Sequence, residues 1–325
     1  MATPSLGSNC RALGRQSQKL GVGVYHVLSL ELYPACARLA AGSAFLALCI
    51  SIGTSPASAT DGYFSNGYGV QAEGLGGASI ADPKDSIAIA ANPASALFLG
   101  NRFDAGVEWF RPDRSATIIG SSVPGANGTY DGNARQDFLI PQLGYVVQIS
   151  PDLALGIAVY GNGGLSTAYN KNPFAAYGSI GTAGINLEQL FAAPTAAYQI
   201  APGHAIGASV NAAYQRITVK GLSAFDNPAF SASPGSVTNQ GVDEAFGIGA
   251  RIGYLGRLTP QLSLGVTYET RTYFEDFKAY KGLFADRGGF DAPQNFGVGV
   301  AYKLTPRLNV TAEYEFIDYS DINSV

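Results

Sequence analysis

Apolar and polar residues alternate with a period of two along most of the chain after about residue 101. In the clearest segment the apolar positions are Leu308, Val310, Ala312, Tyr314 and Phe316. The positions between them are Asn309, Thr311, Glu313 and Glu315. Successive side chains of a β-strand point to opposite faces, so this period predicts strands with two different surfaces.

The alternation predicts about nine strands. They cover residues 102–111, 136–149, 153–168, 186–200, 204–219, 246–254, 262–269, 296–304 and 308–316. Short breaks that contain proline, near Pro151, Pro202, Pro260 and Pro306, predict tight turns. Longer Gly-, Asn- and Ser-rich connections lie near residues 112–134, 161–185, 221–242 and 277–292. Alternating short turns and long loops are typical of outer-membrane barrels.

A water-soluble β-sandwich would show the same alternation, so other features must show whether the outer face of the strands meets water or lipid. The non-apolar face of the predicted strands is small and Gly-rich rather than rich in Lys and Glu, and aromatic residues gather near strand ends. In hydrocarbon a sheet must close so that every strand edge is paired. We therefore predict an all-β fold, a transmembrane antiparallel β-barrel, with a soluble sandwich as the alternative.

The N-terminal region contains a mostly apolar run over residues 39–53, which is too short to span a bilayer as a helix. Arg38 precedes this run, and the small residues Ala57, Ser58 and Ala59 follow it. This order predicts a signal peptide within a leader of residues 1–59, with a buried N-terminal helix as the alternative.

Composition narrows the possible chemistry. The chain has 20 basic and 24 acidic residues, and four of the basic residues lie in the leader, so it has no basic footprint for nucleic acid. Cys10, Cys36 and Cys49 also lie in the leader, which excludes disulfide and thiolate chemistry in the mature part. His204 lies in a predicted turn, where it is a poor base for a Ser hydrolase. We expect no enzyme activity, metal or cofactor.

Residues 60–100 do not alternate and consist mainly of small residues that could pack inside a barrel. This segment contains the run 74–78, with sequence Gly-Leu-Gly-Gly-Ala, and then Asn92, Pro93 and Ala94. Together these motifs closely resemble the N-terminal hatch of the FadL-type long-chain fatty acid transporters. Further resemblances lie at residues 163–167, 211–216 and 314–325, so the likeness covers about residues 60–325.

The resemblance implies a fourteen-stranded barrel, of which about five strands would be absent here. The expected organisation is therefore a leader (1–59), a hatch (60–100) and a C-terminally incomplete transmembrane barrel (101–325). It also implies passive uptake of fatty acids or other hydrophobic compounds across the outer membrane of a Gram-negative bacterium, after removal of the signal peptide. A general porin for small polar solutes and a structural barrel without a transport role are the alternatives.

The resemblance also assigns roles to particular residues. The hatch motif would comprise Gly76, Gly77, Asn92, Pro93 and Ala94. A kink in the third strand that serves as a lateral exit would comprise Gly161, Gly163 and Gly164, although these glycines could belong to an ordinary external loop. An external ligand groove would be lined by Leu222, Phe225, Phe230, Phe277, Leu283 and Phe284, although such aromatics could instead be membrane-interface anchors.

A fatty-acid carboxylate needs a cationic partner once it leaves water. The resemblance assigns this role to Arg216 or Lys220, whereas an inward-facing Arg251 could instead pair with Glu269. The expected partners are a fatty acid, an alkane or an aromatic hydrocarbon, together with outer-membrane lipid. A monomer is expected, and the sequence does not identify the substrate.

Overall fold

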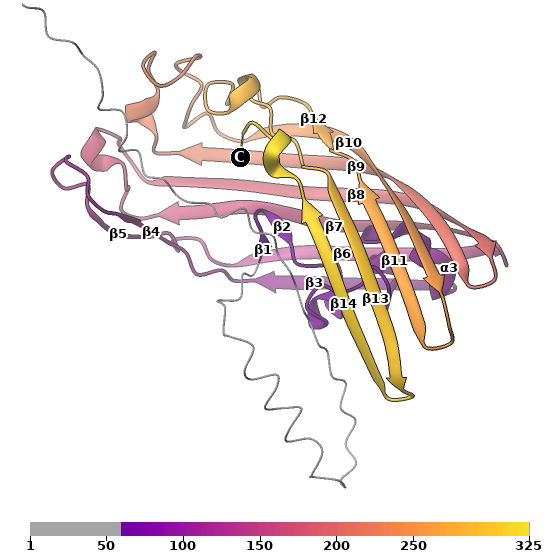
Figure 1. Cartoon of the computed structure of the whole chain (residues 1–325). Coiled ribbons are helices and arrows are strands. Elements are labelled where there is room, and N and C mark those ends of the chain that lie inside the picture. The colour runs from indigo at the N-terminus through magenta and orange to yellow at the C-terminus, as the bar shows by residue number, and fades with distance from the viewer. Residues whose placement is uncertain (1–59, 325) are drawn as a thin grey trace, which may run out of the picture.

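The computed structural model describes residues 60–324, so the predicted leader lies outside the described residues. Within this range nine long strands form one antiparallel sheet that curls strongly about its long axis (Figure 1). In spatial order they are β3 (Arg102–Phe110), β6 (Phe138–Ser150), β7 (Leu153–Tyr169), β8 (Ala183–Ala201), β9 (His204–Lys220), β10 (Asp243–Arg257), β11 (Leu262–Glu269), β13 (Asn295–Thr305) and β14 (Leu308–Ile317). The predicted strands are confirmed.

The shorter elements lie in the N-terminal segment and in the loops. The N-terminal segment contains β1 (Thr60–Asp61), β2 (Phe64–Ser65), α2 (Val70–Gly74), η1 (Ser86–Ala90), η2 (Pro93–Ser95) and α3 (Ala96–Leu99). The loops contain β4 (Ser115–Ile118), β5 (Gly128–Asp131), β12 (Tyr273–Phe274), η3 (Ala175–Tyr177), η4 (Ser223–Phe225), η5 (Ala285–Arg287) and η6 (Tyr319–Asp321). None of the helices in the described part of the chain is long and apolar enough to cross a membrane.

The connections follow the predicted alternation of short and long. The four proline-containing breaks join neighbouring strands by tight turns, and residues 221–242 connect β9 to β10. The predicted strand 153–168 and the predicted loop 161–185 overlap, and the structure agrees with the strand, because β7 continues to Tyr169 and β8 begins at Ala183. The loop 112–134 differs from the prediction, because it contains the hairpin β4–β5.

The two faces of the sheet differ as a lipid-facing barrel requires. On the convex face of β9 and β10, Val210 is 49%, Ile248 62% and Ile252 57% exposed. The opposite positions are buried or half-buried and mostly small or polar. Exposed apolar side chains in a continuous band would be unfavourable in water, and they suit contact with hydrocarbon.

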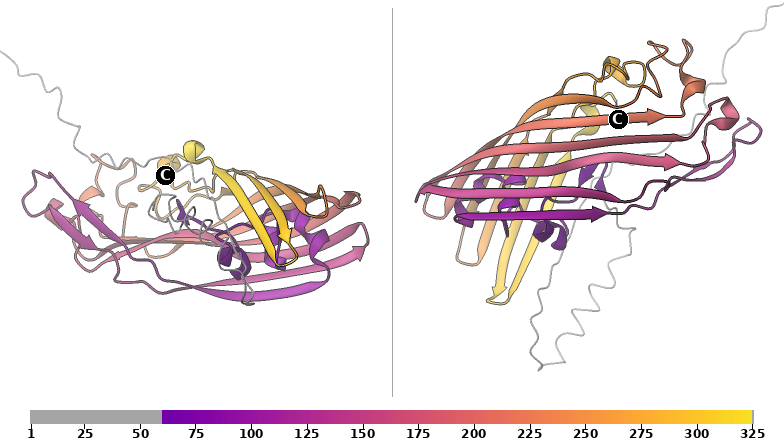
Figure 2. Two further views of the ribbon diagram at one scale, coloured as in Figure 1. Left: turned by 60° about the horizontal axis from the view of Figure 1, so that its bottom comes forward. Right: turned by 180° about the vertical axis from the view of Figure 1, so that it is seen from behind.

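Residues 60–100, here called the hatch segment, lie on the inner side of the curl (Figure 2). Inner glycines let its backbone approach the wall. A Cβ on Gly207 would lie 2.4 Å from Ala94 N, and a Cβ on Gly265 would lie 2.2 Å from Ile80 O. The Gly-rich face recognised in the sequence is therefore the surface on which the hatch segment rests.

Candidate functional site

Strand β7 contains a β-bulge at the glycines predicted to form a kink. Its pairing with β8 shifts between Gly161 and Gly163, so Asn162 is the extra residue. A Cβ on Gly164 would lie 2.4 Å from Leu187 O, which explains the need for glycine beside the bulge. The bulge reverses which side chains face inward: Tyr160 is buried before it, and Leu165 packs against the core after it.

The wall of the sheet is interrupted at the same level. The β6–β7 ladder stops at the Leu143–Val159 pair, although β6 continues to Phe138 and β7 to Tyr169. Beyond that pair β6 is bonded to β3, and β7 to β8. The two strands therefore separate where β7 bulges, which leaves a break in the hydrogen-bonded wall.

The hatch segment covers this break from the inside. Phe64 of β2 pairs with Gly163, and Gly164 N donates a hydrogen bond to Tyr63 O at 2.8 Å. A Cβ on Gly163 would lie 1.7 Å from Tyr63 O, so only glycine allows this contact. The N-terminal strand thus takes a ladder position that β6 leaves vacant.

Buried amides extend from the bulge across the inner wall. Tyr68 Oη donates to Asn162 Oδ1 at 2.8 Å, and Asn162 Nδ2 donates to Gln189 Oε1 at 3.2 Å. Gln189 Nε2 donates to Gln215 Oε1 at 3.1 Å, and Gln215 donates to Phe290 O at 3.0 Å. The chain links the hatch segment, the bulge and the β12–β13 connection. Sequence reasoning missed it, although long amides at inward positions among small residues are its signal.

The Asn-Pro-Ala motif fixes the hatch segment to the wall. Asn92 is fully buried and caps η2, where its side chain accepts a hydrogen bond from Ala94 N at 3.1 Å. Its Nδ2 donates to Ile80 O at 2.8 Å and to Tyr254 O of β10 at 2.9 Å. One side chain therefore joins two parts of the hatch segment to a barrel strand.

The other predicted hatch residues close the end of α2. Gly76 and Gly77 have φ of 69° and 97°, and Gly77 N donates to Ala72 O at 2.8 Å. This left-handed backbone is the usual way for glycine to end a helix. A Cβ on Gly77 would lie 2.4 Å from Asn66 Oδ1. The local backbone conformation explains why these two positions are glycine. Their role in transport stays a prediction.

Replacing Asn92 by alanine should detach the motif from β10. Three buried backbone groups would lose their partners, at a cost of about 1–3 kcal/mol, and uptake of hydrophobic substrate should fall at equal surface expression. The measurement is initial uptake rate together with the amount of folded protein in the outer membrane. Asn170→Ala, at an exposed loop position, is the control. Unchanged uptake in Asn92→Ala would contradict a transport role for the motif.

A cluster of charged and amide side chains contacts the hatch segment at Ala91. Arg251, 2% exposed, donates from Nη1 to Ala91 O at 2.9 Å and from Nη2 to Glu269. Asn295 Nδ2 donates to Glu269 Oε2 at 2.6 Å, and Asn211 Nδ2 donates to Oε1. The predicted pairing of Arg251 with Glu269 is confirmed, and it holds the residue that precedes Asn92.

The chain matches the family described as outer membrane protein transport protein (OMPP1/FadL/TodX) over residues 62–325. It belongs to this family. The suspected resemblance is therefore confirmed, and so is the expectation that the chain is not an enzyme, because the family consists of transport proteins. A search of curated proteins found no match.

Solved structures of channels share the fold. The Pseudomonas putida toluene transporter TodX is 21% identical with a TM-score of 0.59, over 80% of this chain and 72% of that one. The Ralstonia pickettii toluene transporter TbuX is 19% identical with a TM-score of 0.57, over 78% and 72%. A Pseudomonas aeruginosa FadL homologue is 15% identical with a TM-score of 0.53, over 79% and 70%. These likenesses support the predicted barrel.

In this member of the family the two predicted carboxylate ligands lie on the outer face. Odd-numbered residues of β9 are buried and even-numbered ones point outward, so Arg216 and Lys220 do not face the lumen. Arg216 Nη2 lies 2.5 Å from Glu188 Oε2, a cross-strand partner on the same face. The role of either residue in binding a carboxylate stays a prediction, and this placement puts that role on the outer face.

The predicted loop groove divides into two aromatic clusters. The outer cluster lies on the β7–β8 and β9–β10 loops: the ring centroid of Phe225 lies 5.4 Å from those of Phe174 and Phe230, and Phe230 is 64% exposed. The inner cluster contains Phe277, which is fully buried, with Leu222, Leu283 and Phe284 packed against the core around it. The loop 277–290 contacts the inner side of β9, because Gln215 Nε2 donates to Phe290 O and Val219 N donates to Tyr280 Oη.

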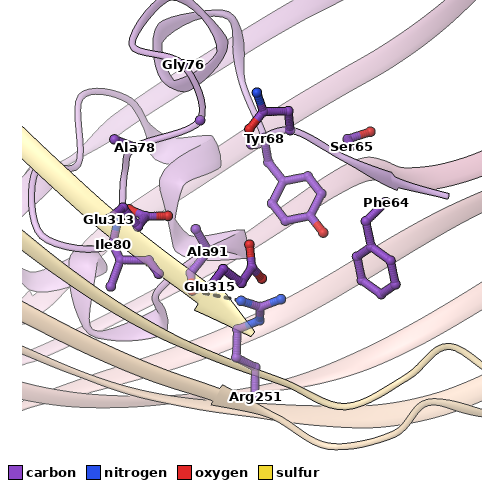
Figure 3. Close-up of a pocket in the computed structure, with 13 residues that line it drawn as sticks. Phe64, Ser65, Tyr68, Gly76, Ala78, Ile80, Ala91, Arg251, Glu313 and Glu315 are labelled. Atoms are coloured by element: carbon purple, nitrogen blue, oxygen red, sulfur yellow. Dashed lines mark hydrogen bonds between the residues drawn. The ribbon is translucent and has the colours of Figure 1, made fainter. Parts of the chain in front are cut away.

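A pocket lies between the hatch segment and strands β10 and β14 (Figure 3). Its apolar lining includes Phe64, Tyr68, Ile80 and Ala91. Its charged lining consists of Arg251, Glu313 and Glu315. In Figure 3 the Glu315 carboxylate lies beside the Arg251 guanidinium. The pocket therefore combines aromatic walls with a compact polar end.

Proposed function

We propose that this chain takes up neutral hydrophobic compounds, such as small aromatic hydrocarbons, and releases them sideways through the wall at the β7 bulge. The observation that carries the proposal is the break between β6 and β7, which the hatch segment covers through Phe64 and Gly163. An apolar molecule that leaves through the wall enters lipid, whereas an axial water-filled pore would keep it hydrated.

The pairing of the charged residues favours neutral compounds over fatty acids. A carboxylate in the lumen needs a cation that is not already neutralised. Arg251 pairs with Glu269, Arg271 lies 2.7 Å from Asp291, and Arg102 lies 2.7 Å from Asp104. The toluene transporters among the similar structures support the same substrate class.

The aromatic clusters support a route from the outside to the bulge. The outer cluster, with the exposed Phe230, would capture ligand from the outer leaflet or from lipopolysaccharide. The inner cluster around Phe277 and Phe290 would pass it towards Tyr63, whose ring centroid lies 5.4 Å from that of Phe290. Tyr63 belongs to the segment that covers the break, so movement of the hatch segment would complete the exit.

Uptake by cells tests the proposal. Cells that carry the gene and cells that lack it are given labelled toluene, a labelled long-chain fatty acid and a labelled small sugar. We expect gene-dependent uptake of toluene and little change for the other two. Uptake of the fatty acid alone would overturn the neutral preference, and sugar entry would indicate a general porin. Entry of none, with folded protein in the outer membrane, would favour a structural barrel.

A further inference from the structure

The outward side chains of β8, β9 and β10 form two aromatic rows with apolar residues between them. Near the short turns, Ile206 pairs across the ladders with Tyr198 and Tyr254. Near the long loops, Tyr214 pairs with Phe246, and their ring centroids lie 5.4 Å apart. The distance from Ile206 to Tyr214 is about 27 Å along the strand, at about 3.4 Å per residue. Allowing for strand tilt, this is close to the height of a lipid-facing band of about 25 Å between two aromatic girdles.

The next outward row lies beyond the Tyr214 girdle and is charged. Arg216 pairs across the ladders with Glu188 of β8 and Glu244 of β10. Arg216 Nε and Nη2 lie 2.7 and 2.5 Å from Glu188 Oε2, and Tyr214 Oη donates to Glu244 Oε1 at 2.8 Å. This row therefore stands at the level where lipid headgroups meet the hydrocarbon.

Two further guanidinium groups lie on the β7 side of this row, at the end of the sheet that carries the β4–β5 hairpin (Figure 1). Arg135 Nη2 donates to Glu188 Oε1 at 3.2 Å, and its guanidinium lies 4.9 Å from the centroid of the Phe138 ring. The Arg114 guanidinium lies 5.6 Å from the same ring and donates to Ser166 O of β7 and to Arg135 O. Since Phe138 begins β6, the arginines stand over the break between β6 and β7.

These three residues, here called the arginine cluster, contact too few carboxylates to neutralise them. Within residues 60–324 Arg135 and Arg216 share Glu188, and Arg114 forms no salt bridge. Burial and the neighbouring charge of Arg135 lower the pKa of Arg114. The side chains of Arg135 and Arg216 are 50% and 49% exposed, so their pairs with Glu188 are weak and open to competition from another anion.

We propose that the arginine cluster binds a phosphate group of the phosphorylated glycolipid of the outer leaflet, the lipid A part of lipopolysaccharide. Guanidinium forks match phosphate oxygens in geometry and charge. The acyl chains of a lipid held at this level would lie along the apolar band below Tyr214, a contact that a free phosphate ion cannot make. The site goes beyond the proposed function, because it recognises a membrane lipid at the wall and not the compound that is taken up.

Lipid binding to the protein purified from the outer membrane tests the site. The probes are lipid A with both phosphates and the same lipid A after enzymatic removal of its phosphates, each titrated into protein in detergent. Native mass spectrometry counts the lipids bound per chain. We expect the phosphorylated form to bind at least about tenfold more tightly, since each basic residue near an anionic lipid surface contributes about a fivefold gain.

A double variant assigns the preference to the cluster. Arg135→Gln with Arg216→Gln should lose most of the preference for the phosphorylated form and leave binding of the dephosphorylated form unchanged. Arg307→Gln, at an exposed arginine of the β13–β14 turn at the opposite end of the sheet, is the matched control and should keep the preference. A preference that survives in the double variant would overturn the site.

A second variant should change the affinity in the opposite direction. Glu188→Gln removes the carboxylate that competes for Arg135 and Arg216, so it should raise the affinity for phosphorylated lipid A about fivefold. Glu275→Gln makes the same change of charge at an exposed position outside the cluster and should leave the affinity unchanged. An unchanged or weaker affinity in Glu188→Gln would contradict the proposed competition.

Competitors identify the source of the phosphate. Inorganic phosphate and phosphatidylglycerol are each added at the concentration of bound lipid A, and neither should displace it. Displacement by inorganic phosphate would show an anion site without lipid recognition. Equal displacement by phosphatidylglycerol would show that any anionic headgroup is held, and either result would overturn the assignment to the outer-leaflet glycolipid. These outcomes do not depend on whether the protein takes up toluene.

Discussion

Replacing Gly163 by alanine is expected to release the N-terminal strand from the wall. The added Cβ would lie 1.7 Å from Tyr63 O and 3.0 Å from Phe64 Cα, both in the hatch segment. Since such an overlap is not tolerated, the pairing of Phe64 with residue 163 must be lost. All three cysteines of the chain lie within residues 1–59, so a Ser65→Cys variant in which Cys10, Cys36 and Cys49 are replaced by serine carries a single thiol beside the break.

The measurement is the rate at which this introduced thiol reacts with a membrane-impermeant thiol reagent. We expect Gly163→Ala to raise this rate at least about tenfold, which corresponds to about 1.4 kcal/mol in the opening equilibrium. Toluene uptake should rise as well, because the segment that fills the exit is already displaced. Gly74→Ala is the control, since a Cβ there meets nothing within 4 Å. Equal labelling in the two variants would show that the hatch segment does not depend on Gly163.

Replacing Glu269 by glutamine should destabilise the barrel more than any other single change considered. Arg251 would keep its charge at 2% exposure without its counter-ion, and Asn211 and Asn295 would lose a charged acceptor. Breaking a buried ion pair in this way costs about 3–5 kcal/mol. The measurement is the free energy of unfolding by urea in detergent, followed by the fluorescence of Trp109.

The outer face supplies a matched control. Glu188 pairs with Arg216 and Arg135, but its side chain is 34% exposed. Glu188→Gln should therefore change the free energy of unfolding by no more than about 1 kcal/mol. The double variant Arg251→Gln with Glu269→Gln should recover part of the loss, because no unpaired charge remains. Equal destabilisation by the two single variants would contradict the structural role assigned to the buried pair.

The sequence predicted the strands because a period of two is a local property. The alternation along 308–316 or 296–304 does not depend on the order of the strands in the sheet. A proline at 151 or 306 likewise ends its strand whichever strand is the neighbour. The motif Asn92-Pro93-Ala94 was recognised as a resemblance. The capping bond from Ala94 N is local, whereas the bonds that Asn92 donates to Ile80 O and Tyr254 O depend on residues 12 and 162 positions away.

At the outer ends of the strands, only the tertiary structure shows which side chains point into the lumen. In the middle of β9, apolar residues point to lipid and small ones point inward, so composition identifies the faces. Near Arg216 the outward face is charged, whereas the inward residues Ile217 and Val219 are apolar, so composition there indicates the opposite orientation. Only the pairing of Arg216 with Glu188 and Glu244 across neighbouring strands decides that it points away from the lumen.

The sequence by itself thus determined the strands, their turns, the small inner face and the family motifs, because each is written in neighbouring residues. Tertiary structure alone decided that Gly163 receives Tyr63 and that Phe277 is buried while Phe230 is exposed. It also decided that Arg251 retains one unpaired donor beside Glu313 and Glu315. Each of these depends on contacts between segments brought together by the curl of the sheet, which no local pattern encodes.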